Sequence, residues 1–113
     1  MNSTRFLMTD FNKPFIPQRA DPQISLVNGR YYFTASYPAY DRIVLRASDT
    51  LAGLPGAEEV TVWQAHSSGP MSCHVWAPEL HFLQGQWYLY FAAGEKEDVW
   101  KIRPYVLRCT GND

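Results

Sequence analysis

With 113 residues, the sequence is long enough for one domain with a modest hydrophobic core. Its 10 Lys and Arg residues nearly balance its 11 Asp and Glu residues, which argues against a nucleic acid or an anionic membrane as partner. No apolar run approaches the roughly 20 residues of a spanning helix, and residues 1–19 lack a signal-type apolar segment, so we expect a cytoplasmic protein.

The first predicted element is a β-hairpin. Strand-forming residues at Ile24–Val27 and Arg30–Ser36 flank Asn28–Gly29, the dipeptide that best fits a tight type I′ turn. A third strand is expected at Arg42–Ala47. A fourth, Val60–Gln64, follows after a loop.

A second hairpin of the same kind follows. Strands at Leu80–Leu83 and Gln86–Ala93 flank Gln84–Gly85, and a further strand is expected at Trp100–Cys109. Pro104 lies within this last strand. Because proline cannot donate to a strand ladder, it predicts an edge strand or a bulge.

The two hairpins belong to an internal repeat. Residues 22–33 align on residues 78–89 without a gap, at an offset of 56 residues, and four short antiparallel strands per repeat are typical of a propeller blade. A helical alternative fails because no stretch keeps a 3.6-residue period. We therefore predict an all-β chain of about two four-stranded antiparallel blades, one at about residues 20–66 and one at about 74–113.

Two blades do not close a ring. Propellers have roughly four to eight blades, and a single blade cannot bury both faces of its sheet. Either a further segment or several copies of the chain must complete the ring. Association of the chain with itself is the preferred interpretation if it is stable.

The cysteines and histidines do not indicate a metal site. A disulfide between Cys73 and Cys109 is possible, but two reduced, buried thiols are favoured. His66, His74 and His81 are too scattered to argue for zinc. We predict neither a metal nor a cofactor.

Asp21 is the first candidate for chemistry, because it directly precedes Pro22 at the mouth of the first hairpin. A proline favours extended geometry in the residue before it, so we expect a stiff backbone to aim the carboxylate. The innermost strand of a propeller blade begins near the central axis, where side chains of several blades converge. The alternative is that this Asp-Pro pair only initiates a turn.

An ordered set of motifs resembles glycoside hydrolase family 43. The segments that carry the resemblance are Arg19–Ile24, Tyr31–Ser36, Ser68–Gly69, His74–Leu80 and Trp87–Ala93. The resemblance runs from about Pro14 to the C-terminus. It implies a five-bladed β-propeller, of which this chain would be the N-terminal portion.

The resemblance also implies an inverting glycosidase with three acidic groups. Asp21 stands in the place of the general base, whereas the second Asp and the acid Glu would lie beyond the second blade. Glu79 is not taken as the acid, because the family places its acid later. A base without an acid leaves the sugar oxygen to depart poorly, so a single chain is expected to be inactive or feeble. The other glutamates are interpreted as charged residues in loops: Glu58, Glu59, Glu95 and Glu97.

Aromatic residues form the second part of the implied site. The resemblance places Trp76 in the pocket that grips the terminal sugar, with His74 and Tyr37 in segments that border it. Core packing is the alternative for Trp76. The other tryptophans are expected to pack in the core or between blades: Trp63, Trp87 and Trp100.

The leading hypothesis is that this chain is part of a hydrolase that acts on arabinose- or xylose-bearing plant polysaccharides. Ile16–Pro22 and Tyr40–Arg46 look most like exo-acting α-L-arabinofuranosidases, while β-xylosidase and endo-arabinanase remain open. A second hypothesis is a non-catalytic module that binds sugar or assembles with itself, which would keep Trp76 without needing Asp21. A third is a truncated product without a function of its own.

Overall fold

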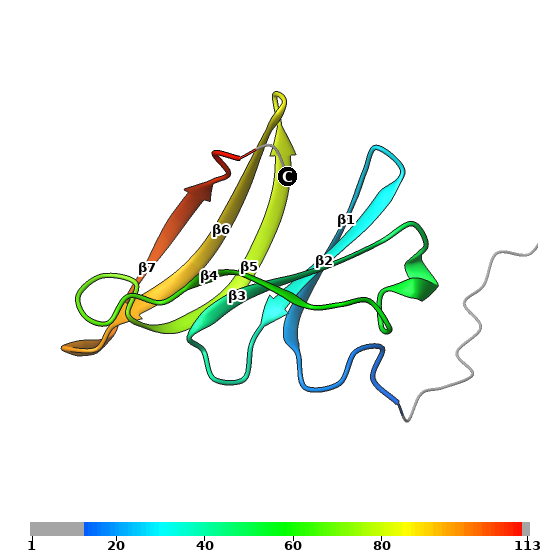
Figure 1. The fold of residues 1–113 in the computed structure, drawn as a ribbon. Coiled ribbons are helices and arrows are strands. Elements are labelled where there is room, and N and C mark those ends of the chain that lie inside the picture. The colour runs from blue at the N-terminus through cyan, green and yellow to red at the C-terminus, as the bar shows by residue number, and fades with distance from the viewer. Residues whose placement is uncertain (1–12, 112–113) are drawn as a thin grey trace, which may run out of the picture.

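Two antiparallel β-sheets lie side by side in the computed structural model, which describes residues 13–111 (Figure 1). The first sheet has the order β1 (Ala20–Val27), β2 (Arg30–Ser36), β3 (Arg42–Ser48) and β4 (Val60–Gln64). The second has the order β5 (Cys73–Leu83), β6 (Gln86–Glu95) and β7 (Asp98–Arg108). One 3-10 turn, η1 (Leu51–Gly53), interrupts the connection between β3 and β4.

The predicted all-β class is confirmed, and the first sheet has the four expected strands. The second sheet has three strands within residues 13–111, where a four-stranded blade was expected. The ends of the predicted domain, residues 1–12 and 112–113, lie outside the described residues. In the described part, no helix is long and apolar enough to cross a bilayer.

Both hairpin turns have the predicted geometry. Asn28 and Gly29 have φ angles of 52° and 78°, and Gln84 and Gly85 have 52° and 76°. Positive φ at both central positions is the requirement of a type I′ turn, which follows the twist of the flanking strands. These local signals therefore determined the pairing of β1 with β2 and of β5 with β6.

The innermost strands begin earlier than the sequence predicted. β1 begins at Ala20 rather than Ile24, and β5 begins at Cys73 rather than Leu80. Register shifts interrupt the ladder near the start of both strands. Such bulges break the alternation of inward and outward side chains by which a strand is recognised in a sequence.

Pro104 fits its predicted environment. It lies opposite Ala92 in the ladder between β6 and β7. Within the described chain β7 is an edge strand of the second sheet. An edge tolerates the missing donor of proline, as the sequence predicted.

The main core lies between the two sheets. Four buried side chains from β3, β5 and β6 form its centre: Ile43, Val75, Phe91 and Ala93. Trp63 packs on Phe91 with ring centroids 5.1 Å apart, and Trp87 packs on Tyr32 at 5.0 Å. The predicted packing role of these two tryptophans is therefore confirmed. A smaller cluster covers the other face of the first sheet, with Ile16, Phe33, Ala35 and Leu54.

Hydrogen bonds from side chains of the first sheet to the backbone of β5 form a seam between the sheets. Gln23 accepts from the N–H of Leu80 at 3.0 Å and donates to its carbonyl at 3.1 Å. Ser25 donates to the same carbonyl at 2.9 Å. The N–H of Ala77 donates to the hydroxyl of Ser36 at 2.8 Å. This seam, made by Gln23, Ser25 and Ser36, fixes how the starts of β1 and β5 face each other.

Replacing Ile43 with alanine tests the core between the sheets. Ile43 is 0 % exposed, so we expect Ile43→Ala to lower the free energy of unfolding by about 2–5 kcal/mol. Ile24→Ala is the matched control, because Ile24 is 43 % exposed and should cost only about 0.5 kcal/mol. Urea denaturation measures both, and equal losses would contradict a core at this position.

Candidate functional site

Asp21 adopts a left-handed backbone conformation at the start of β1, with φ of 51°. The expectation of extended geometry before Pro22 was therefore wrong. The register shift between Ala20 and Gln23 marks a bulge at this point, and a bulge turns a side chain away from the regular pleat. Aspartate tolerates this conformation better than most residues, and such strained positions concentrate at functional sites.

The second sheet repeats this geometry without the carboxylate. Ala77 lies 56 residues after Asp21, also precedes a proline, and has φ of 50°. One register shift precedes it, between Cys73 and Trp76, and a second, between Trp76 and Glu79, includes it. Of these two equivalent bulges, only the first carries an acidic group.

A serine connects the Asp21 carboxylate to the second sheet. The buried Ser36 hydroxyl donates a long hydrogen bond of 3.5 Å to Asp21 Oδ2 and accepts the 2.8 Å hydrogen bond from the N–H of Ala77. Ala77 directly follows Trp76. The seam thus brings the carboxylate of the first sheet close to the backbone segment of β5 that carries Trp76.

Trp76 is half-buried and held by two neighbouring rings. His74 stacks on it with centroids 4.7 Å apart and an interplanar angle of 23°, while Tyr40 meets it edge-on at 5.9 Å. The His74 Nδ1–H donates to the carbonyl of Val99 at 3.0 Å, which fixes the orientation of the imidazole. The structure therefore brings Trp76 and His74 together, as the predicted site requires.

Tyr37 lies beneath two arginines. The guanidinium carbons of Arg19 and Arg42 are 4.7 Å and 4.4 Å from its ring centroid. Such cation–π contacts stabilise the arginines and occupy the ring face. A sugar contact by Tyr37 would therefore involve its hydroxyl rather than its face, and its role in sugar binding stays a prediction.

Glu59 is a structural residue that the sequence analysis missed. Its carboxylate accepts hydrogen bonds from Arg19 at 2.5 Å and from Arg46 at 3.2 Å, and its side chain is only 17 % exposed. Burial alone raises the pKa of Glu59, but the hydrogen bonds from Arg19 and Arg46 outweigh it and hold the pKa below its ordinary value. Arg19 stands two residues before Asp21, so its ion pair with Glu59 holds the backbone segment that leads into the candidate base. Because Arg19 and Glu59 are 40 positions apart, no local pattern reveals the pairing.

Trp100 does not pack in the core of the described residues, so that part of the prediction was wrong, while packing of Trp100 between blades stays a prediction. Its side chain is 74 % exposed at the start of β7, where it contacts His74 with ring centroids 5.3 Å apart. Cys73 and Cys109 are free thiols, and both are partly exposed rather than buried. Among residues 13–111, no group of three or more His, Cys, Asp and Glu side chains is placed to hold a metal ion.

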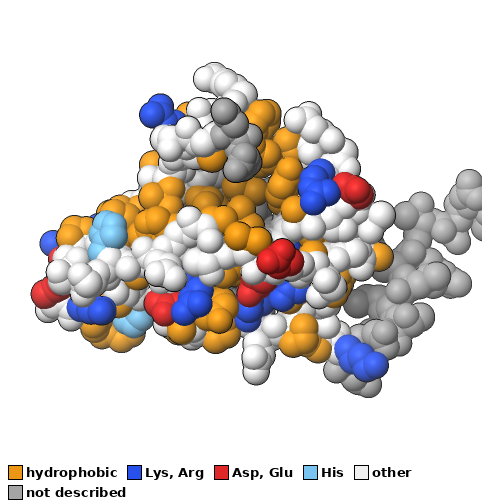
Figure 2. Space-filling model, viewed as in Figure 1, with side chains coloured by type: hydrophobic (Ala, Val, Ile, Leu, Met, Phe, Trp, Pro, Cys, Tyr) orange, Lys and Arg blue, Asp and Glu red, His pale blue; other side chains and the backbone are white. Residues whose placement is uncertain are grey.

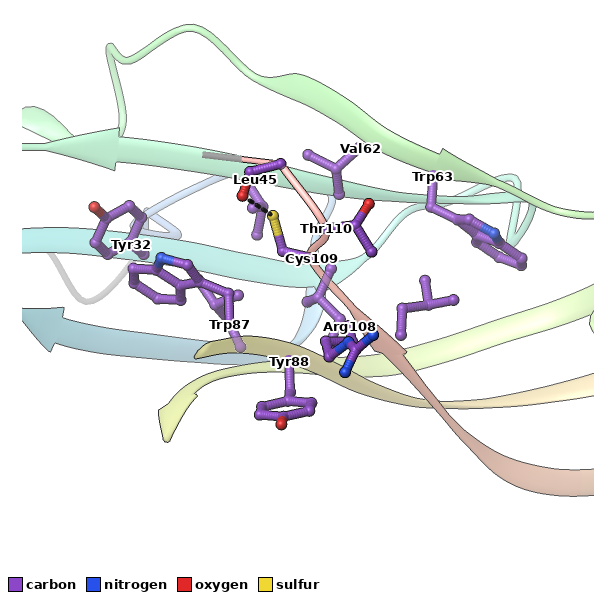
Figure 3. A pocket seen from close by; sticks show the side chains of 13 residues that line it. Tyr32, Leu45, Val62, Trp63, Trp87, Tyr88, Arg108, Cys109 and Thr110 are labelled. Atoms are coloured by element: carbon purple, nitrogen blue, oxygen red, sulfur yellow. Dashed lines mark hydrogen bonds between the residues drawn. The ribbon is translucent and has the colours of Figure 1, made fainter. Parts of the chain in front are cut away.

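A hydrophobic cavity of about 440 Å³ lies elsewhere, where the two sheets diverge (Figures 2 and 3). Its walls include Tyr32, Leu45, Val62, Trp87 and Leu107. None of the four predicted site residues lines it. We therefore place the candidate site at the starts of β1 and β5, and not in this cavity.

Comparison with known proteins agrees with the resemblance in the sequence. The profile of Glycosyl hydrolases family 43 matches residues 11–113. Extracellular exo-α-(1→5)-L-arabinofuranosidases of Streptomyces avermitilis and Streptomyces chartreusis are each 57 % identical over 98 residues, which is 86 % of this chain. The crystal structure of an α-L-arabinofuranosidase from Lactobacillus brevis superposes with a TM-score of 0.82 at 42 % identity over 96 % of the chain.

The chain spans 20 % and 30 % of the two Streptomyces proteins and 36 % of the Lactobacillus brevis structure. Both Streptomyces proteins are named extracellular, which contradicts the cytoplasmic location expected from the sequence. That expectation rested on the lack of an apolar leader in residues 1–19. A leader belongs to the start of a precursor, so a sequence that spans only part of its relatives cannot be judged by its first residues.

The Glu59 ion pairs predict a specific dependence of stability on pH. Because the folded-state pKa of Glu59 is lowered, its contribution is complete above the ordinary pKa of a glutamate, roughly 4, and is lost as the pH falls through the folded-state value. We expect Glu59→Gln to lower the free energy of unfolding by about 2 kcal/mol at neutral pH. The difference in this free energy between the variant and the unsubstituted chain should shrink as the pH falls. Thermal unfolding between pH 7 and pH 2.5 measures it. Glu58 is the exposed neighbour, so the stability of Glu58→Gln relative to the unsubstituted chain should not change with pH. A loss of stability in Glu59→Gln that is the same at every pH would contradict the lowered pKa of Glu59.

Proposed function

Because this chain belongs to glycosyl hydrolases family 43, we propose that it supplies the general base and a sugar-binding aromatic residue of an inverting hydrolase that removes arabinofuranosyl residues. The observation that carries the proposal is the link from Asp21 through Ser36 to Ala77, next to Trp76. It joins an exposed carboxylate of the first sheet to the backbone of the residue that follows Trp76 in the second. The names of the Streptomyces relatives support arabinose over xylose as the sugar, and they also support an extracellular protein.

Asp21 suits the role of general base because solvent reaches it. In an inverting enzyme the base takes a proton from water, and the resulting hydroxide attacks the anomeric carbon on the face opposite the leaving group. The exposed side chain at the bulge leaves room for that water. Base and acid stand roughly 6.5–9.5 Å apart in such enzymes, so the acid must come from another element.

Glu79 does not suit the role of the acid. Its carboxylate hydrogen-bonds His81 at 3.0 Å, and it lies beyond the Ala77 bulge in β5. The departing sugar oxygen therefore needs a proton from a residue outside this pair. We expect the activity of this chain alone to be lower by about 10²–10⁴-fold than that of a protein with a positioned acid.

Trp76 suits the role of sugar binding because a flat ring packs well against the apolar face of a pentose. His74 stacks on Trp76 and hydrogen-bonds Val99, so the ring is held in place before a ligand arrives. A preorganised side chain loses little conformational entropy on binding. In this proposal Asp21 activates the attacking water while Trp76 holds the sugar ring.

Uncovered apolar side chains favour self-association as a second candidate function. Tyr90 and Val106, paired across β6 and β7, are 43 % and 51 % exposed. A sheet face of this kind is stabilised when another sheet covers it. Copies of the chain would then complete one another around a common axis.

Replacing Asp21 with asparagine tests the proposed base. In a preparation with turnover on a chromogenic arabinofuranoside, we expect Asp21→Asn to lower kcat by about 10²–10⁴-fold while arabinose binding stays unchanged. Asp49→Asn is the control, because Asp49 is an exposed aspartate that pairs only with Arg30 in the described structure. Equal kcat values for Asp21→Asn and the unsubstituted protein would exclude the base assignment. Sugar binding without turnover in either form would favour a non-catalytic module.

Light scattering tests the self-association candidate. We expect a defined mass that is a multiple of the 13.0 kDa chain, because ring closure buries the face around Tyr90 and Val106. Tyr90→Glu should shift the mass toward the monomer, since it places a charge in that contact. A monomer that remains stable and soluble at all concentrations would rule out this candidate.

A further inference from the structure

We propose that Trp100 binds a second pentose ring of an arabino-oligosaccharide whose terminal ring lies at Asp21 and Trp76. The inference rests on the proposed function and extends it from one sugar to a chain. Its basis is a continuous row of rings, which we call the aromatic ridge: Tyr40, Trp76, His74 and Trp100. Nothing in the proposed hydrolytic step requires Trp100, yet it is the most exposed large apolar side chain in the described structure.

The aromatic ridge extends without a break from Tyr40 to Trp100. Ring centroids are 5.9 Å apart from Tyr40 to Trp76, 4.7 Å from Trp76 to His74, and 5.3 Å from His74 to Trp100. Figure 1 shows that β1, β5 and β7 all begin on the same side of the molecule. The ridge is therefore on the side of the molecule where β1 begins, with Asp21 as its second residue, and its Trp100 end is exposed in the described structure.

The backbone around Trp100 is built to hold this position. Gly94 in β6 pairs with Cys73, and a Cβ at Gly94 would lie 2.8 Å from the carbonyl oxygen of Val99. The missing side chain lets that carbonyl approach β5 and accept the hydrogen bond from His74. The start of β7 is thereby joined to the start of β5, so Trp100 has a fixed location despite its exposure.

The surroundings of Trp100 favour a sugar over a protein partner. Charged side chains flank the indole in sequence, with Asp98 and Lys101 both exposed, and Lys101 pairs with Glu95 at 3.4 Å. The centre of a protein interface is depleted of charged residues. A sugar ring, in contrast, offers hydroxyl groups to charged side chains and an apolar face to the indole. An oligosaccharide matches both features.

The inference predicts that affinity depends on the length of the oligosaccharide. Titration calorimetry would compare L-arabinose, α-1,5-arabinobiose and α-1,5-arabinotriose on the full chain. We expect the two oligosaccharides to bind about three- to tenfold more tightly than arabinose, the range of one aromatic contact. Trp100→Ala should abolish this gain and leave the Kd for arabinose within about twofold of its original value. Trp100→Phe, which keeps a ring, should retain most of the gain.

Phe15→Ala is the matched control, since it removes an exposed aromatic residue outside the ridge and should preserve the gain. A length-dependent gain that persists in Trp100→Ala overturns the inference while leaving the proposed function intact. Absence of any arabinose binding by the unsubstituted chain counts against both. A lower solution mass of Trp100→Ala with unchanged sugar binding would assign the indole to a protein contact, and would also overturn the inference.

Discussion

The candidate site depends on the seam between the two sheets. Leu80 is a buried residue of β5, and side chains of β1 satisfy both its N–H and its carbonyl. A buried backbone group without a partner costs about 1–3 kcal/mol, so Gln23 and Ser25 do more than add contacts. They determine which part of the first sheet faces β5. The same seam continues through Ser36 to Ala77, which places the Asp21 carboxylate beside the Trp76 segment.

Elements specified by local chemistry were predictable from the sequence. The turns at Asn28–Gly29 and Gln84–Gly85 need two residues that accept positive φ, and the repeat showed that both hairpins share one plan. The strand β4 was also predicted with its observed bounds, Val60–Gln64. Residues 13–111 thus have the all-β, antiparallel arrangement that alternation and turn chemistry indicated.

Features that arise from tertiary contacts were not predictable. Pro22 favours extended geometry at Asp21, but the observed bulge gives Asp21 a left-handed conformation. The ion pair of Glu59 with Arg19 links positions that no local pattern connects, so Glu59 was taken for a loop charge. The strand containing Trp100 was predicted, whereas the exposure of Trp100 and its contact with His74 depend on how β7 lies against the start of β5. The identity of Asp21 as the candidate base came from the family and not from its geometry.

The seam also has a consequence for the order of folding. Each hairpin closes through a two-residue turn, and isolated hairpins form in about 1–10 μs. The seam instead joins residues that are 41 and 57 positions apart, and the entropy of closing such loops must be overcome before these contacts form. The hairpins therefore precede the seam. Asp21 and Trp76 come together only when the seam forms, so a chain with both hairpins formed but no seam still lacks the site.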